Sequence, residues 1–505
     1  LSPMYRALLS TSGFTLLSRI TGFIRDMIMA SVLTPGLLSD AFFVAFRLPN
    51  HFRAIFAEGA YNAAFVPMYS GLRATDPDKA EAFSRTMLGW QVLIQAVLLA
   101  VAMIAMPQVV LLLAPGFAGD PAQVALASEL TRITFAYLLC ITVVTHLGGV
   151  LNSRDSFWAA AAAPVLLNIC MSVALVLVVF FPTAAHAAAW GVLAGGVAEL
   201  LLLLFSARRL GASILPGVPR LTEDVRTFFG RFVPATVGAA GVQLAMFADT
   251  IFASFLGAGA YTSLYFADRI NQLPMGVIAI ALGTVLLPQV SKSVKLGDLG
   301  ATHRAFRRAT ETGLLLTLPC TAAFFVIPDI IMTGLFARGA FSVEAAHAAA
   351  AVLLAYAAGL PAFVMLRTVT PLFHARGDTR TPVVATGIAI GVNLALKALF
   401  VMGLNFGVVG LALATAIGTW VNVLVLGGQG WRLGYMEVSA AFAATVARMA
   451  GAAAYAGVVA WLLVGVIADI LSPGLALRAE ILMVVMGLVG LGAYGLGLLA
   501  VGWRR

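Results

Sequence analysis

Long apolar segments recur along the whole chain and are separated by short polar breaks. A helix needs about 20 mostly apolar residues to cross the hydrocarbon core of a bilayer. By this length criterion, the pattern predicts fourteen membrane-spanning helices. The predicted spans lie at 8–33, 38–70, 84–114, 123–151, 157–181, 185–207, 229–257, 260–290, 308–336, 344–374, 381–403, 406–430, 439–468 and 479–503.

The composition agrees with this pattern. Of the 505 residues, 61% are hydrophobic and 10% are charged, whereas soluble globular domains are about 45–50% apolar and about 25% charged. The longest polar connections, at 206–228 and 290–308, have the size of loops. The sequence therefore predicts an all-α polytopic membrane protein, with no stretch polar enough to form a soluble domain.

Lysine and arginine are distributed unevenly between the two sets of predicted loops. The set that includes both terminal segments holds 19 of the 31 basic residues, and the other set holds only Arg338 and Arg478. Because cytoplasmic loops are enriched in Lys and Arg, this split predicts that both termini are cytoplasmic. The net charge of +9 is thus interpreted as a topology signal and not as a nucleic-acid surface.

An internal repeat is visible at an offset of 223 positions. The segment DMIMASVL at 26–33 matches DTIFASFL at 249–256, and NSRD at 152–155 resembles HARGD at 374–378. The repeat unit contains six predicted spans, an even number, so both copies have the same orientation in the membrane. Parallel repeats of this kind are a transporter architecture. We expect an N-lobe at 1–209, a C-lobe at 210–432 and two extra helices at 433–505.

Charged side chains occur inside several predicted spans. A charge at the centre of a membrane helix costs about 2.5–3.5 kcal/mol, so such residues should face a hydrated cavity or pair with one another. In the N-lobe they are Arg19, Arg25, Asp26, Asp40, Arg47, Arg53 and Glu58, and in the C-lobe they include Asp249, Asp268 and Arg269.

Two interpretations of these charges remain open. The acidic residues fit structural ion pairs that hold helices together. The arginines outnumber the acidic residues that could pair with them in these spans, and this excess leaves positive charge in a cavity. Guanidinium groups suit bidentate contact with phosphate oxygens. This excess predicts an anionic, phosphate-bearing substrate.

Two prolines occupy matching places in the two lobes. Pro49 lies inside the second predicted span and Pro274 inside the eighth. Each removes a helical hydrogen bond and favours a kink. We interpret them as hinge or gate positions, with a static kink as the alternative.

The sequence contains no motif for cofactor chemistry. No G-x-x-x-x-G-K-[ST] phosphate loop and no H-E-x-x-H motif occurs, and the six histidines are scattered. We therefore expect no cofactor and no metal site. His146 is interpreted as a packing residue, with a proton relay as the alternative.

Three charged segments carry a resemblance to a known family. SRITGFIRD at 18–26, SDAFFVAFRLPN at 39–50 and IFAEGA at 55–60 closely resemble the MurJ (MviN) lipid II flippases. Further matches are APGF at 114–117, TIFASFL at 250–256, YFADR at 265–269 and ALGTVLLP at 281–288. The resemblance extends from about residue 8 to 430 and continues weakly to the end.

The resemblance implies the fourteen-helix fold of the multidrug/oligosaccharidyl-lipid/polysaccharide exporter superfamily. It also implies alternating-access export of lipid II, the undecaprenyl-diphosphate-linked peptidoglycan precursor, from the cytoplasmic to the periplasmic leaflet, in a bacterial inner membrane. The last two spans would form a groove for the lipid tail. Two positions depart from some members: Ala54 replaces a second arginine and Gln272 replaces a glutamate. The family pattern points to Arg19, Arg25, Asp26, Asp40, Arg53 and Arg269 as functional, and Arg47 and Glu58 complete our candidate substrate-binding set.

A second candidate site lies in the C-lobe. Asn393 and Lys397 are one turn apart and share a face of the eleventh predicted span. Parts of the family bind sodium near such a buried acid, but here a lysine ammonium can take the place of a cation. We predict an intramembrane pair of Asp249 and Lys397, with Asn393 as a hydrogen-bonding neighbour and no sodium. The alternative is that Lys397 reaches an interface and Asp249 faces the cavity alone.

Other functions fit the sequence less well. The same superfamily contains exporters of other lipid-linked oligosaccharides and cation-coupled drug antiporters, but a cationic drug requires an acidic cavity. A membrane enzyme acting on lipid diphosphates requires a cluster of catalytic acids or histidines, which the sequence lacks. A pure scaffold fits the charged spans least. We expect a monomeric transporter whose partners are lipid II and membrane lipids.

Overall fold

The computed structural model describes residues 3–52, 60–471 and 477–502 of the chain. Within these ranges all regular secondary structure is helical. Helices satisfy their own backbone hydrogen bonds, which is a requirement for a chain that crosses hydrocarbon. The predicted all-α class is confirmed.

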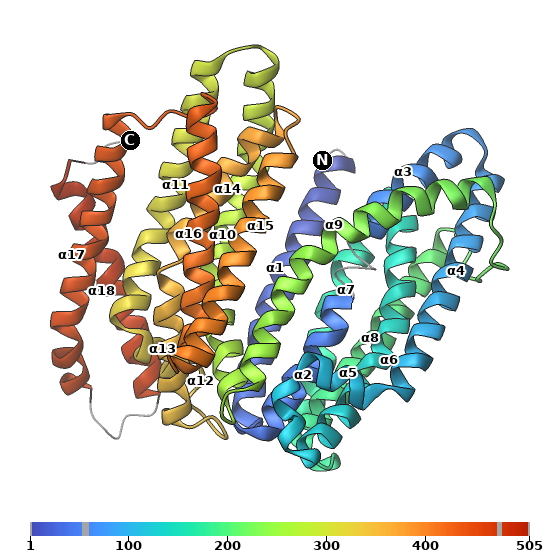
Figure 1. Cartoon of the computed structure of the whole chain (residues 1–505), viewed down its shortest axis with the longest axis horizontal. Helices are drawn as coiled ribbons and strands as arrows, with labels where there is room; N and C mark the ends of the chain where they lie inside the picture. Colours follow the sequence, from blue (N-terminus) through green and yellow to red (C-terminus); the bar gives the residue numbers. More distant parts are fainter. Residues whose placement is uncertain (1–2, 53–59, 472–476, 503–505) are drawn as a thin grey trace. The chain divides into compact units, whose positions relative to one another are not determined.

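The helices form two compact units, Leu1–Gly259 and Ala260–Arg505, whose helices are labelled in Figure 1. The first unit contains α1 (Pro3–Val32), α2 (Leu37–Phe52), α3 (Ala60–Thr75), α4 (Pro77–Ile104), α5 (Met106–Leu113), η2 (Pro115–Gly119), α6 (Pro121–Asn152), α7 (Trp158–Val176), η3 (Val178–Phe180), α8 (Ala184–Arg209) and α9 (Glu223–Ser254). The second contains α10 (Ala260–Lys295), α11 (Leu299–Val326), α12 (Pro328–Phe336), α13 (Val343–Ala357), α14 (Leu360–His374), α15 (Arg380–Ala398), η4 (Leu399–Gly403), α16 (Gly407–Arg432), α17 (Ala440–Ile470) and α18 (Arg478–Ala500). The lobe boundaries expected at 209/210 and 432/433 stay predictions.

Ten helices in the described residues are long and apolar enough to cross a membrane. They correspond to predicted spans three to six and nine to fourteen. The other four predicted spans correspond to α1, to α2 with α3, to α9 and to α10, the helices that carry the charged side chains. A multi-pass membrane protein is therefore confirmed, and the count of fourteen stays a prediction.

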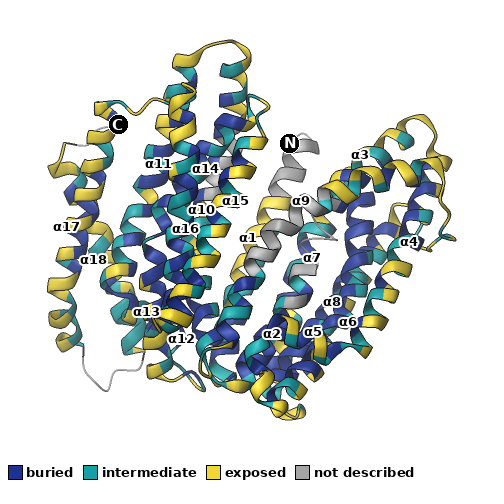
Figure 2. Cartoon of the chain, viewed as in Figure 1, coloured by how far each residue is buried: buried dark blue, intermediate teal, exposed yellow. Residues whose placement is uncertain are grey.

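The exposed side chains of these helices are largely apolar. Trp461 and Ile470 on α17 are 66% and 76% exposed, and Leu499 on α18 is 74% exposed. Figure 2 shows long exposed stretches on α17 and α18. A soluble protein rarely exposes so much contiguous apolar surface, whereas lipid tails suit such faces.

Helix starts are set by short polar side chains in the loops. The Asp76 carboxylate accepts a hydrogen bond from the Lys79 amide, and Pro77 follows at the first helical position of α4. Asp120 does the same for α6, where Pro121 is the first residue. These caps satisfy amides that a helix leaves unpaired, and proline loses nothing at that position.

The helix bounds confirm the internal repeat. Helices α4 and α11 have 28 residues each and begin 222 positions apart. Helices α7 and α15 have 19 residues each at the same offset, and α8 and α16 have 26 each at an offset of 223. Equal lengths at a constant offset are what a duplicated chain predicts.

The turns after α6 and α14 repeat in detail. In the first turn, the Ser156 amide donates to the Leu151 carbonyl, and in the second the Asp378 amide donates to the Phe373 carbonyl. The residues before them, Asp155 and Gly377, both have a positive φ. Asp378 then accepts a 2.9 Å hydrogen bond from the Thr381 amide at the start of α15. Hydrogen bonds from Thr381 lower the pKa of Asp378.

The segment between α8 and α9 is held along one face of α4. Positions 81, 85 and 89 on α4 are spaced by four and therefore lie in one row. Trp90 stands beside that row. The contacts are Ser213 amide to Glu81 Oε2 (3.1 Å), Gly217 amide to the Arg85 carbonyl (2.7 Å) and Trp90 Nε1 to the Arg220 carbonyl (3.2 Å). This strap, residues 213–220, fixes where α9 begins.

Helices α15 and α16 are joined by two side-chain hydrogen bonds. Asn393 Nδ2 donates to Thr415 Oγ1 and Asn422 Nδ2 donates to Thr386 Oγ1, both at 3.3 Å. The partners are seven residues apart on each helix, which places the two bonds in one antiparallel seam. Such bonds between membrane helices contribute about 0.6 kcal/mol each on average.

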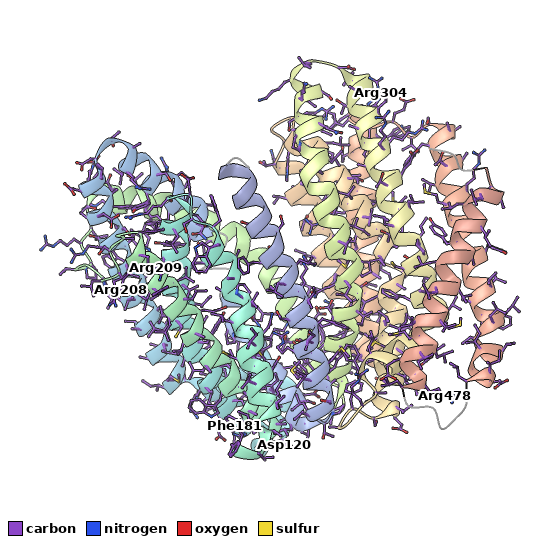
Figure 3. All side chains as sticks on the ribbon, turned by 180° about the vertical axis from the view of Figure 1, so that it is seen from behind. Asp120, Phe181, Arg208, Arg209, Arg304 and Arg478 are labelled. Atoms are coloured by element: carbon purple, nitrogen blue, oxygen red, sulfur yellow. The ribbon has the colours of Figure 1, made fainter. Side chains whose placement is uncertain are left out.

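The ends of the helices separate the two kinds of loop. Figure 3 shows Arg208 and Arg209 at one end of the first unit and Asp120 and Phe181 at the opposite end. In the second unit, Arg304 and Arg478 lie at opposite ends. This placement matches the predicted alternation of loops within each unit.

The two basic residues of the arginine-poor loops have local structural partners. Arg338 Nη2 lies 3.2 Å from Glu480 Oε1 and also donates to the Gly334 carbonyl. Arg478 donates to the Ala468 and Leu471 carbonyls at the end of α17. A cation at a helix C-terminus is stabilising. These two exceptions to the charge split are therefore explained by local structure.

Candidate functional site

Arg25 and Asp26 form a buried ion pair on α1. Nε and Nη2 of Arg25 lie 3.1 Å and 2.7 Å from the same carboxylate oxygen, Oδ1. The two residues are 3% and 2% exposed. Arg25 Nη1 donates to Asn168 Oδ1 on α7 at 2.9 Å. Burial of a charge is tolerable because it is paired and hydrogen-bonded, so this arginine is anchored inside the first unit.

Asn168 contacts α1 with both ends of its amide. Besides accepting from Arg25, it donates from Nδ2 to the Ser18 carbonyl at 2.9 Å and to Thr21 Oγ1 at 3.3 Å. Gly22 gives it room, because a Cβ there would stand 3.3 Å from Nδ2. Asn168 is 6% exposed, so these polar contacts form away from solvent.

Asp40 ties the start of α2 to the residues that follow α9. Its Oδ2 accepts a 2.8 Å hydrogen bond from the Gly259 amide, and the residue is 5% exposed. Gly259 has a φ of +86°, which favours glycine at this point.

Arg47 and Asp249 connect α2 and α9. Their Nη2 and Oδ2 atoms lie 3.8 Å apart, and their side chains are 26% and 15% exposed. The acid therefore has a cationic neighbour within the first unit. The predicted pair of Asp249 with Lys397 stays a prediction.

Arg19 has different surroundings from Arg25 on the same helix. Arg19 is exposed, whereas Arg25 is buried. The two are six residues apart, which at about 3.6 residues per turn places them on different faces of α1. Convergence of the arginines on one cavity stays a prediction.

The second unit contributes a charged pair of neighbours on α10. Gln272 Nε2 donates to Asp268 Oδ2 at 2.6 Å, and the Arg269 guanidinium lies 5.4 Å from the centre of the Tyr265 ring. Gln272, at the position where some family members have a glutamate, thus gives Asp268 a neutral hydrogen-bond donor. A cation over an aromatic face is stabilised by the ring quadrupole.

Lys397 is 2% exposed on α15. Asn393, one turn earlier, uses its amide nitrogen for Thr415 on α16. Burial of a lysine in a membrane helix carries a large cost unless it pairs. The intramembrane pairing of Lys397 stays a prediction.

The remaining predicted residues are placed only in part. Pro49 is buried inside α2 and Pro274 lies within α10. Arg53 and Glu58 lie outside the described residues. Within the described residues, no group of three or more His, Cys, Asp or Glu side chains could hold a metal ion.

Sequence reasoning missed two buried polar residues. Asn168 carries no charge and stands alone in an apolar segment, so no pattern marked it. Glu199 on α8 is 2% exposed, and Tyr137 Oη lies 3.4 Å from its Oε2. An acid inside a predicted span was a sufficient signal for Glu199.

Comparisons with known proteins identify the family. A family model described as "Lipid II flippase MurJ" matches residues 29–480. The "Probable lipid II flippase MurJ" of Rhizobium meliloti (strain 1021) is 39% identical over 423 residues, which cover 83% of this chain and 78% of the relative. The chain belongs to the lipid II flippase MurJ family. It is therefore a multi-pass bacterial membrane protein of a transporter family, and the resemblance proposed from its motifs is confirmed.

Solved structures show that the fold is also that of MurJ. The structure titled "Lipid II flippase MurJ, inward closed conformation" superposes with a TM-score of 0.81 at 24% identity, covering 96% of this chain and 97% of the other. An inward-facing multidrug resistance MATE family transporter of the MOP superfamily gives 0.68 at 17% identity, covering 82% and 94%. MurJ and MATE proteins thus share this fold.

Proposed function

We propose that this MurJ-family chain is a lipid II flippase, a transporter and not an enzyme. The observation that carries the proposal is the family match over residues 29–480. Lipid II, the undecaprenyl-diphosphate-linked peptidoglycan precursor, would cross from the cytoplasmic to the periplasmic leaflet by alternating access. Its diphosphate supplies the negative charge that the arginines of the charged helices suit.

The proposed substrate-binding residues differ in what they could do. Arg19 is exposed and is the first candidate for direct contact with the diphosphate. Arg25 pairs with Asp26 and donates to Asn168 on α7, Asp40 accepts from Gly259, and Arg47 lies near Asp249. These groups would shape the site through the helices they join. Arg53, Glu58 and Arg269 complete the proposed set.

Alternating access requires helices that bend or tilt. Pro49 in α2 and Pro274 in α10 interrupt helical hydrogen bonding in corresponding elements. We place the hinges there. We also propose that both termini are cytoplasmic, since the arginine-rich loops lie on one side in the predicted topology, that the chain works as a monomer, and that its partners are lipid II and membrane lipids.

Reconstituted vesicles test the function directly. The purified chain is placed in liposomes containing labelled lipid II, and the label in each leaflet is followed with a membrane-impermeant reagent. Protein-dependent loss of leaflet asymmetry is expected. Empty liposomes and a phosphatidylglycerol probe serve as controls. Movement of another lipid-linked oligosaccharide without movement of lipid II would overturn the proposal and identify a different exporter.

A further inference from the structure

Asn168 holds α1 at two points that lie on one stripe of that helix. Its amide nitrogen contacts Ser18 and Thr21, and its amide oxygen contacts Arg25. Residues 18, 21, 22 and 25 are spaced by three, four and seven and therefore face the same direction. One side chain of α7 thus bonds α1 along two turns.

These hydrogen bonds of Asn168 restrict the rotation of α1 about its own axis. The nitrogen bonds the Ser18 carbonyl, which belongs to the helix backbone, and the oxygen bonds the guanidinium of Arg25, which is also held by Asp26. Rotation of α1 about its axis would break both contacts. Arg25 would keep Asp26, which lies on the same helix, but the buried Asn168 amide would lose its partners on α1, at a free-energy cost larger than that of an ordinary hydrogen bond.

The rotation of α1 decides where Arg19 points. Arg19 follows Ser18 by one residue and so lies about 100° around the helix from it. With the stripe 18–25 held against α7, Arg19 lies on a side of α1 that is exposed. The contacts of Asn168 with α1 therefore determine that the Arg19 guanidinium lies on the exposed side, although Arg19 takes no part in them.

We propose that Asn168 is a positioning residue for lipid II transport, which fixes the rotation of α1 on α7 and thereby presents Arg19 to the lipid diphosphate. The inference rests on the proposed function for its substrate. The proposal has two parts. The structural half states that Asn168 sets the direction of Arg19, and the functional half states that this direction matters for lipid II transport. Asn168 touches no substrate in this scheme and acts through α1.

The structural half is tested without lipid II. Cys140, Cys170 and Cys320 are replaced by alanine, Arg19→Cys is added, and its labelling by a water-soluble maleimide is timed in membranes. Because Arg19 is presented outward, labelling should be fast with Asn168 in place. Asn168→Ala should slow the labelling about tenfold, because the hydrogen bonds that fix the rotation of α1 are then lost. Equal rates with and without Asn168→Ala, or no labelling in either, would overturn the proposal.

The functional half uses initial rates of lipid II movement against lipid II content in vesicles. Asn168→Ala should raise the half-saturating content about tenfold, the loss expected for one hydrogen bond to a charged group. In an Arg19→Ala background it should add nothing further, because the effect passes through Arg19. A fall in maximal rate with unchanged half-saturation would indicate a merely structural role and would overturn the proposal.

Two further variants distinguish an effect on the position of α1 from misfolding of the Asn168→Ala protein. Gly22→Ala places a Cβ 3.3 Å from Asn168 Nδ2 and should shift both readouts in the same direction, by about twofold to threefold if the contact moves by a few tenths of an ångström. Ser172→Ala removes a hydroxyl that donates to the Asn168 backbone carbonyl at 2.8 Å, leaves the Asn168 amide in place and should behave as the wild type. If vesicles with the wild-type protein move no lipid II while maleimide labelling responds as expected, the proposed function is refuted. The role of Asn168 in setting the direction of Arg19 would still stand.

Discussion

Gly89 on α4 and Gly217 in the strap meet backbone to backbone. A Cβ on Gly89 would stand 2.0 Å from the Gly217 carbonyl oxygen. No side chain can move aside to relieve this overlap, because both groups are main chain. The close approach lets the strap lie against α4, where the Gly217 amide bonds the Arg85 carbonyl at 2.7 Å.

Gly89→Ala is expected to destabilise the protein although alanine favours helix. Overpacking in a tight contact costs about 1–3 kcal/mol, and the strap has to move away from α4. Thermal unfolding in detergent should show a lower midpoint. Gly71→Ala is the matched control, because Gly71 lies in α3 with nothing within 4 Å of its Cβ position. A Gly89→Ala midpoint equal to that of Gly71→Ala would refute the expectation.

Arg47 and Asp249 are expected to be energetically coupled. The pair is partly buried at 3.8 Å, so its coupling should exceed that of an exposed pair and reach about 1 kcal/mol. A double-mutant cycle of Arg47→Ala and Asp249→Ala, followed by unfolding and by lipid II transport, measures it. Additive effects of the two substitutions would show that the ions do not interact. Arg304→Ala with Asp298→Ala, an exposed pair at 4.0 Å, is the comparison.

The fold was predictable because its determinants are repeated along the sequence. Apolar length predicts each of the ten hydrophobic helices, and the charge split predicts which ends are alike. The eight-residue match at 26–33 and 249–256 predicts a duplication that the bounds of α4 and α11 bear out. These signals are local or periodic, so they can be recognised in the sequence without knowledge of tertiary contacts.

The partners of the charged residues were not predictable from spacing. Helical periodicity places Arg19 and Asp26 on one face, yet Asp26 pairs with its neighbour Arg25 and Arg19 is exposed. The deciding residue, Asn168, lies 143 positions from Arg25. Helix packing creates such contacts, and a single polar residue in an apolar segment gives no periodic signal.

His146 is expected to act as a packing residue. It is fully buried, with Nδ1 2.7 Å from Tyr61 Oη and Nε2 3.0 Å from Ser84 Oγ. His146→Leu would leave two buried hydroxyls without this partner, at about 1–3 kcal/mol each. Unfolding should therefore shift markedly, while the shape of the transport profile between pH 6 and about pH 8 should match the wild type. A changed pH profile would instead favour the proton relay.

The membrane potential is expected to drive export. An anionic headgroup moving outward from a negative interior gains about 2.3 kcal/mol per charge per 100 mV. Vesicles with a potassium gradient and valinomycin set the potential, and lipid II movement is compared at several values. The rate should fall as the potential is collapsed. A rate that is constant across potentials would exclude this energy source, and a neutral lipid probe controls for leakage.

Lys397 is expected to make transport independent of sodium. It is 2% exposed on α15, and its ammonium can supply the positive charge that a bound cation would bring to Asp249. Wild-type transport should therefore be equal in sodium and in choline. Lys397→Met keeps the apolar stem and removes the charge, so it should slow transport in both salts or create a sodium requirement. Arg367→Met is the control, because Arg367 is exposed on α14 over the Phe363 ring. A wild-type rate that depends on sodium and loses that dependence in Asp249→Ala would show that the cation, and not the lysine, occupies the site.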